Sequence, residues 1–285
     1  MATVRIGVSG WTYRHWRGAF YPTGLVHRRE LEYVSHRLNS VEINGSFYSL
    51  QRPASFRRWY EETPAGFEFA VKGGRFITHM KKLNDVDDAL ANFFASGVLR
   101  LAEKLGPVLW QFPPNLAFNR DRFERFLDLL PRDSGEAATL AAKHTGRLPG
   151  WTWTEAEHDG PLRYAVEVRH PSFFTAEFAD LLRGHGVALV IADTAGTWPY
   201  SETLTADFVY IRLHGAEQLY ASGYTDAQLD AWAVKVRDWH AGSETGEGLG
   251  RPDAARDVYV YFDNDIDAHA PFDAIRLSER MSSEL

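Results

Sequence analysis

Short runs rich in β-branched residues alternate with longer segments of helical periodicity along the whole chain. The eight runs are VRIGVS (4–9), SVEIN (40–44), FEFAVK (67–72), PVLWQF (107–112), YAVEVR (164–169), VALVIAD (187–193), FVYIRLH (208–214) and VYVYFD (258–263). Strands that alternate with helices are typical of parallel βα units rather than of a sandwich. Eight such units predict an α/β fold that closes into a single (β/α)8 barrel of the TIM type.

The segments between the runs repeat apolar residues at helical spacing, which predicts helices that coat the barrel. Two such stripes are Phe123, Phe126, Leu127 and Leu130, and Leu229, Trp232, Val236 and Trp239. Residues 131–162 are expected to be an insertion between strands four and five, with an extra helix at 136–143. The Gly-rich residues 242–256 are expected to be a mobile loop. The length of 285 residues fits one barrel domain over 1–285.

Polar residues occupy alternate positions near the carboxyl ends of these strands. The apolar parity is expected to face the helices and comprises Val41, Ile43, Phe69, Val71, Val108, Trp110, Val166, Val168, Val209, Ile211, Leu213, Val260 and Phe262. The polar parity comprises Glu42, Asn44, Lys72, Gln111, Glu167, Arg169, Asp193, Arg212, His214 and Asp263. Side chains of one parity share a face, so the polar set is predicted to converge in the barrel mouth, where barrel enzymes have their active sites.

This polar set has two interpretations. Burying unpaired charges costs several kcal/mol each, so a purely structural barrel is expected to have aliphatic layers there. As an active site, the set offers Glu42, Glu167, Asp193 and His214 for proton transfer, and Lys72, Arg169 and Arg212 for an anionic group. As an internal salt-bridge network, the carboxylates neutralise the same three cations, and Arg169 only orients a carboxylate.

Further candidates follow the strands in the loops. The candidate substrate-binding residues beyond the cations are Trp11, Tyr13, Asn44, Tyr48, Gln111, His170, Asp263 and Asn264. Flat aromatic side chains stack on sugars or bases, whereas Trp16, Phe20 and Tyr21 are expected to pack in the core. His214 is followed by Gly215, which would let the backbone approach a ligand closely.

Cofactor chemistry has weaker sequence support. Glu167, Asp193, His214 and Asp263 could bind a divalent cation, although nearby cations can satisfy the carboxylates and no compact metal motif is present. A Schiff base at Lys72 would need a depressed pKa, which neighbouring carboxylates oppose. Neither GxGxxG after the first strand nor a Walker loop occurs, so no nucleotide-cofactor motif is found.

Composition limits the classes of function. With 45% hydrophobic and 24% charged residues, the chain is expected to fold as a globular protein. It has no cysteine, which excludes disulfides and thiolate metal sites and fits the cytoplasm. No signal peptide and no apolar run of membrane-spanning length are found, so no membrane association is expected. A net charge of −7 argues against broad nucleic-acid binding.

Several well-separated motifs resemble the YecE-like family, domain-of-unknown-function family 72. They are GVSGWTYRHWRGAFYP (7–22), VEINGSFY (41–48), FAVKGGRFITH (69–79), LWQFPP (109–114), VEVRHPSF (166–173), YIRLHG (210–215) and YVYFDND (259–265). The resemblance covers nearly the whole chain and implies a barrel fold, but no established activity. The family usually has two asparagines after the last strand, where this chain has Asp263 and Asn264, and a glycine where it has Ala268.

Three functional hypotheses remain open from the sequence. The first is an enzyme performing acid–base chemistry, hydrolysis or isomerisation, on a small polar substrate that is anionic or sugar-like; Glu42 and Glu167 would suit a glycosidase at the right separation. The second is an enzyme acting on single-stranded nucleic acid or a damaged base. The third is a non-catalytic metabolite-binding protein. The fold cannot choose among them, and the sequence does not define an oligomeric state.

Overall fold

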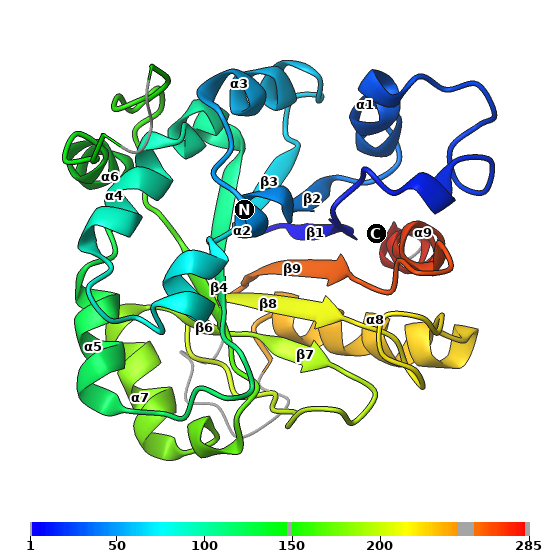
Figure 1. The fold of residues 1–285 in the computed structure, drawn as a ribbon. Helices are drawn as coiled ribbons and strands as arrows, with labels where there is room; N and C mark the ends of the chain where they lie inside the picture. The colour runs from blue at the N-terminus through cyan, green and yellow to red at the C-terminus, as the bar shows by residue number, and fades with distance from the viewer. Residues whose placement is uncertain (1, 147–149, 244–253, 283–285) are drawn as a thin grey trace. The chain divides into compact units, whose positions relative to one another are not determined.

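The computed structural model describes residues 2–146, 150–243 and 254–282. Nine β-strands alternate with helices in these residues, and the fold is α/β. The chain divides into two compact units, residues 1–42 with 186–285 (unit 1) and residues 43–185 (unit 2). Figure 1 shows the order of the elements by colour.

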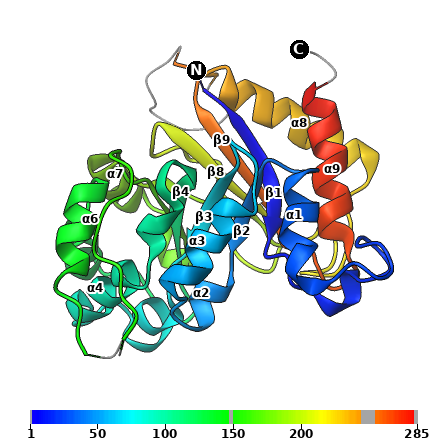
Figure 2. The ribbon, with the colours of Figure 1, turned by 90° about the horizontal axis from the view of Figure 1, so that it is seen from above.

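Unit 1 is built on a parallel sheet with the strand order β2-β1-β9-β8-β7. Its strands are β1 (Val4–Ser9), β2 (Ser40–Ile43), β6 (Ala188–Leu189), β7 (Ile191–Asp193), β8 (Phe208–Leu213) and β9 (Asp257–Phe262). Its helices are η1 (Arg14–Trp16), η2 (His27–Arg29), α1 (Glu30–Ser35), α8 (Asp226–His240) and α9 (His269–Ser282). Helix α9 packs on β1 and β9, and α8 packs on α9 and β9 (Figure 2).

Unit 2 contains three parallel strands in the order β5-β4-β3. They are β3 (Glu68–Lys72), β4 (Leu105–Gln111) and β5 (Tyr164–Glu167). Its helices are α2 (Gly45–Tyr48), α3 (Pro53–Glu61), η3 (Phe76–Met80), α4 (Asp87–Ala95), η4 (Val98–Lys104), α5 (Arg120–Asp128), α6 (Ser134–Ala141), η5 (Pro171–Phe173) and α7 (Ala176–His185). Helix η3 is a π-helix, and the others labelled η are 3₁₀-helices.

The predicted helical stripes are confirmed. Helix α5 buries Phe123, Phe126 and Leu127, and α8 buries all four apolar residues of its stripe. The extra helix expected at 136–143 is present as α6, two residues earlier in the sequence. Helix α8 begins with a capping box between Thr225 and Gln228, which satisfies free amides of its first turn. The loop predicted at 242–256 lies largely outside the described residues.

The run 187–193 forms two strands instead of the one predicted, β6 and β7. The Thr205 hydroxyl accepts a hydrogen bond from the Leu189 amide and donates one to the Val187 carbonyl, both at 2.7 Å. A side chain therefore takes the place of a neighbouring strand there, and pairing with β8 begins only at Ile191. The described residues contain nine strands because of this interruption, where the sequence predicted eight.

Candidate functional site

Unit 1 buries an ion pair between Glu42 on β2 and Arg212 on β8, both 0% exposed. Arg212 Nε donates to Glu42 Oε2 at 3.1 Å and Arg212 Nη2 donates to Oε1 at 2.9 Å, a bidentate pairing. Ser9 Oγ also donates to Oε1, and Tyr210 Oη donates to Oε2 at 2.6 Å. Burial raises the pKa of Tyr210 well above its usual range, which keeps its hydroxyl a donor. The Glu42 carboxylate thus accepts four hydrogen bonds.

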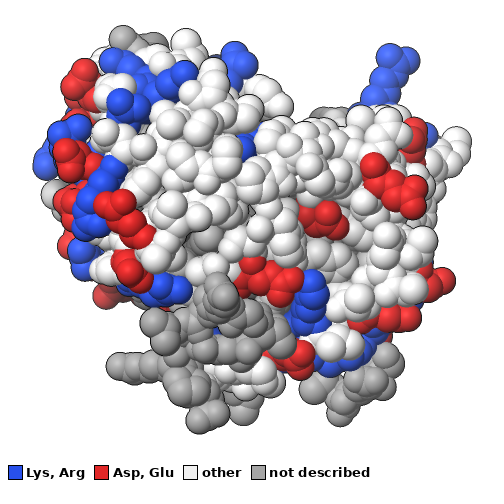
Figure 3. Space-filling model, turned by 90° about the horizontal axis from the view of Figure 1, so that it is seen from below, with Lys and Arg blue, Asp and Glu red and all other residues white. Residues whose placement is uncertain are grey.

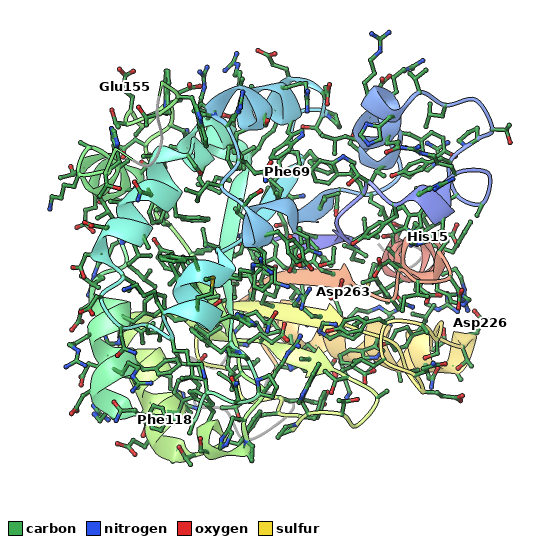
Figure 4. The ribbon with its side chains drawn as sticks, in the orientation of Figure 1. His15, Phe69, Phe118, Glu155, Asp226 and Asp263 are labelled. Atoms are coloured by element: carbon green, nitrogen blue, oxygen red, sulfur yellow. The ribbon has the colours of Figure 1, made fainter. Side chains whose placement is uncertain are left out.

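Arg212 extends this network to the carboxyl end of β9. Its Nη2 lies 2.8 Å from Asp263 Oδ2, and its Nη1 lies 3.3 Å from His214 Nε2. Since a guanidinium only donates, His214 Nε2 is the acceptor and Nδ1 carries the ring proton. That Nδ1 lies 3.0 Å from Asp263 Oδ2. Figure 4 labels Asp263 at the end of β9. His214 therefore has both ring nitrogens against charged partners.

These contacts favour a structural role for Glu42 and His214 over the predicted proton transfer. A base needs an unoccupied lone pair facing a substrate, and the nitrogen that could serve as one on His214 accepts from Arg212.

Gly215 has a different role from the one expected. It has φ of 114°, and a Cβ there would lie 2.5 Å from the Gln218 carbonyl oxygen, so its own loop requires glycine.

The face predicted for Asp193 from the alternation along its strand is wrong. The register pairs Asp193 with Leu213 and Ala192 with Arg212, so Asp193 shares the face of the apolar parity. Its Oδ2 accepts from Tyr224 Oη at 3.0 Å. Of the predicted metal ligands, His214 and Asp263 lie side by side, Asp193 is on the other face of its strand, and Glu167 belongs to unit 2. Within the described ranges, no group of three or more histidine and carboxylate side chains could hold a metal ion.

The sequence missed Asp265, two residues beyond Asp263. Burial and the Asp263 charge raise the pKa of Asp265 to about 6. Tyr13 contacts the Asp265 carboxyl and donates its one hydrogen to the Ser9 carbonyl at 2.5 Å. The Tyr13 contact lowers the pKa of Asp265 and so opposes the larger effect of burial. Trp16 Nε1 donates to the Asp265 carbonyl at 3.3 Å, which fixes the backbone of this loop.

Unit 2 holds a second cluster at the carboxyl ends of its strands. Glu167 on β5 is 1% exposed, and its Oε1 lies 2.8 Å from both Nε and Nη2 of Arg169. Lys72 at the end of β3 is 7% exposed, and its Nζ lies 4.7 Å from the centre of the Phe47 ring, a cation–π contact. Gln111 pairs in register with Glu167, so the two share a face. Gln111 Nε2 donates to the Phe112 carbonyl at 3.0 Å.

His79 also belongs to this cluster and was not assigned from the sequence. It lies on the π-helix η3, and its Nδ1 is 2.8 Å from Thr78 Oγ1. Burial, followed by the charges of Lys72 and Arg169, lowers the pKa of His79 to about 4. The imidazole is therefore neutral at physiological pH. The available signal was its place in the quoted motif FAVKGGRFITH, in the loop after a strand, where barrel enzymes place functional groups.

The loop candidates have different environments. Of the two aromatic residues expected to border the pocket, Trp11 is 8% exposed and Tyr48 is 67% exposed. Asn44 is half-buried before α2. Asn264 is buried, and its amide nitrogen donates to the Ser222 carbonyl and to Asp273, so it ties loops together. His170 Nδ1 accepts from the Ser172 amide at the start of η5.

The aromatic residues predicted to pack in the core do so. Trp16, Phe20 and Tyr21 are 0%, 7% and 1% exposed. Tyr21 Oη donates to the Trp11 carbonyl at 2.6 Å, which joins two of these aromatic positions. No helix of the described chain combines the length and apolar character required to cross a membrane.

The chain is thus an α/β protein with a cluster of buried ionisable side chains at the strand ends of each unit. It belongs to the family described as "Protein of unknown function DUF72", whose model matches residues 5–285. It is similar to the UPF0759 protein YecE of Escherichia coli K12, with 26% identity over 278 residues, 89% of this chain and 88% of that protein. The UPF0759 protein YunF of Bacillus subtilis is 29% identical over 116 residues, 39% of this chain and 40% of that protein.

Solved structures of the same family share the fold. A DUF72 family protein from Thermotoga maritima matches with a TM-score of 0.73 and 25% identity, covering 97% of this chain and 98% of that one. A DUF72 family protein from Enterococcus faecalis matches with a TM-score of 0.68 and 16% identity, covering 98% and 95%. The family resemblance inferred from the separated motifs is confirmed by these matches.

Proposed function

We propose that the protein is an enzyme that performs acid–base chemistry, hydrolysis or isomerisation, on a small substrate with an anionic group. The observation that carries this proposal is the grouping of Lys72, Arg169 and Glu167 with a neutral histidine at the strand ends of unit 2. Lys72 and Arg169 supply two cations, Glu167 supplies one carboxylate, and His79 beside them is neutral. The two cations would attract an anionic group of a substrate, and the carboxylate and the imidazole are side chains that can exchange protons.

The pKa of His79 would change when an anionic substrate binds to the cluster. Lys72 and Arg169 are among the causes of that low pKa. A bound anion would offset their repulsion, so the pKa of His79 would rise and its ring nitrogen would become a stronger base. Glu167 is the second group that can move a proton, and it also orients Arg169. Lys72 and Arg169 would bind the substrate, and Glu167 and His79 would transfer protons.

The test is a panel of phosphoester, glycoside and sugar-phosphate isomerase substrates, assayed with the parent, Lys72→Met, Glu167→Gln and, as a control, the exposed Lys143→Met. Loss of a charge-assisted hydrogen bond costs about 1.5–3 kcal/mol, so kcat/KM of Lys72→Met should fall roughly 10- to 100-fold on an anionic substrate. Glu167→Gln should abolish turnover, and Lys143→Met should match the parent.

Binding separates the proposal from its rivals. Phosphate should raise the Tm of the parent but not of Lys72→Met. Equal stabilisation of both proteins, or full activity of Lys72→Met, would refute the proposed anion site. Phosphate binding with no turnover across the panel would favour the metabolite-binding hypothesis. Figure 3 shows both acidic and basic side chains on the face that it draws. The net charge of −7 gives a nucleic-acid substrate less support.

We also propose the finer architecture. In it the strands close into one (β/α)8 barrel domain over 1–285, residues 131–162 are an insertion, and both clusters open at the same end. A crystal structure tests this arrangement directly. The absence of cysteine supports a cytoplasmic location, which fractionation of cells would test.

A further inference from the structure

Unit 2 contains a cavity of about 520 Å³ whose wall does not include Lys72, His79, Glu167 or Arg169, the residues of the unit 2 cluster (the Lys72 cluster). It lies between the π-helix η3, helix α4 and the turn at residues 145–146, and none of its lining residues belongs to unit 1. Its volume is in the range of small-molecule sites, about 300–1,000 Å³. The apolar part of the wall is formed by Leu50, Phe76, Ile77, Ala89 and Phe93. Phe76 is 36% exposed, so an aromatic ring is accessible at this wall.

Among the lining residues that the structure describes, negative charge is in excess, and both carboxylates are exposed to solvent. Asp85 and Asp88 contribute two carboxylates, and Lys81 contributes one ammonium group. Within residues 2–146, 150–243 and 254–282, neither carboxylate is in an ion pair. The Asn92 amide and Thr145 also line the cavity and bond to each other, with Asn92 Nδ2 donating to Thr145 Oγ1 at 3.0 Å. The polar wall is therefore complementary to one positive charge.

The backbone beside the cavity is held in conformations that cost free energy. Lys82, Leu83 and Asp85 have φ of 48°, 68° and 48°, in the left-handed region that favours glycine. Leu83 is only 6% exposed, so burial of its side chain anchors the segment. A π-helix precedes it directly. Strained backbone persists only where the surrounding structure stabilises it, and both strained backbone and π-helices are frequent at functional sites.

We propose that this cavity is a second binding site, for a small molecule with an aromatic or aliphatic body and one ammonium or amidinium group. The body would pack on Phe76, Ile77 and Phe93, and the cation would lie against Asp85 and Asp88. This charge preference is opposite to the one proposed for Lys72 and Arg169, so the two proposed sites would select different molecules. The proposal does not depend on the proposed function, because binding is measured without turnover.

The test is isothermal titration calorimetry with three probes that share one skeleton: 2-naphthylmethylamine, naphthalene-2-methanol and 2-naphthoate. The amine should bind roughly tenfold more tightly than the alcohol, since only the amine gains the charge-assisted contact. The carboxylate should bind most weakly. The variants are Asp88→Asn, Ala89→Trp and, as a matched control, Asp87→Asn, which changes the neighbouring carboxylate of α4 that does not line this cavity.

Asp88→Asn should remove most of the preference for the amine over the alcohol, and Asp87→Asn should keep it. Ala89→Trp should fill the cavity and abolish binding of the amine and the alcohol, with circular dichroism confirming that the variant is folded. The proposal is overturned if the alcohol binds as tightly as the amine, if none of the probes binds, or if Asp88→Asn leaves the preference for the amine intact.

Discussion

Replacing Glu42 by glutamine tests whether the unit 1 network is structural. The carboxylate accepts hydrogen bonds from Ser9, Tyr210 and two nitrogens of Arg212. Glutamine retains one oxygen, so its NH2 group would face donors, and the fully buried Arg212 would lose a counter-ion. Removing one partner of a buried ion pair costs about 3–5 kcal/mol. At roughly 2 °C per kcal/mol for a chain of this size, Tm should fall by about 6–10 °C.

The measurement is urea unfolding followed by circular dichroism, with thermal melts alongside. Glu32→Gln is the control, because Glu32 pairs with Arg29 on the surface and its loss should leave Tm unchanged. A Glu42→Gln protein whose free energy of unfolding stays within about 1 kcal/mol of the parent would refute the structural interpretation. If that stable variant also lost turnover on the substrate panel, Glu42 would be a catalytic residue after all.

Three further predictions concern pH and backbone strain. The pKa of His79 is lowered to about 4 from 6.5, so its contribution to the stability of the fold is present above pH 6.5 and is lost as pH falls towards 4. His79→Gln should therefore reduce the loss of stability in acid by roughly 1 kcal/mol, after allowance for solvent screening. Equal acid sensitivity of the two proteins in urea titrations would contradict this. The pKa of Asp265 is raised from 3.8 to about 6, so its stabilisation is present below pH 3.8 and is lost as pH rises through 6. Relative to the parent, Asp265→Asn should therefore raise the free energy of unfolding by about 1–2 kcal/mol more at neutral pH than at pH 4. An effect of the same size at both pH values would rule out the raised pKa. Ala268 has φ of 60°, so Ala268→Gly should raise the free energy of unfolding by roughly 0.5–1 kcal/mol, and a lower Tm would show that the left-handed backbone is not strained.

The hydrophobic pattern predicted the strands well because burial in a parallel sheet determines composition directly. The first run, 4–9, coincides with β1, and most others differ from the observed strands by one or two residues at an end. The run 187–193 was the exception. Its interruption depends on Thr205, which is distant in sequence and whose hydroxyl bonds to that segment. A contact of this kind leaves no trace in local periodicity.

The candidate site was predictable where strands alternate in polarity. Glu42 and Arg212 follow clear alternation, and the structure brings them together with Asp263. Asp193 ends a run in which the preceding residues are all apolar, so no alternation indicates its face, and the assigned parity was wrong. The apolar pattern could not place His79, because a π-helix lacks the 3.6-residue period of an α-helix. The low pKa of His79 was also not predictable, because it depends on cations from other segments.

The position of His79 also depends on the length of its helix. A π-helix has hydrogen bonds from i to i+5, one residue more per bonded turn than an α-helix. Deleting a single residue within Phe76–Met80 would allow an α-turn to form, and each residue of an α-helix rotates by about 100° around its axis. The histidine would then leave the cluster without any change in its own identity. In related chains, a one-residue gap at this segment would therefore mark proteins whose chemistry has diverged.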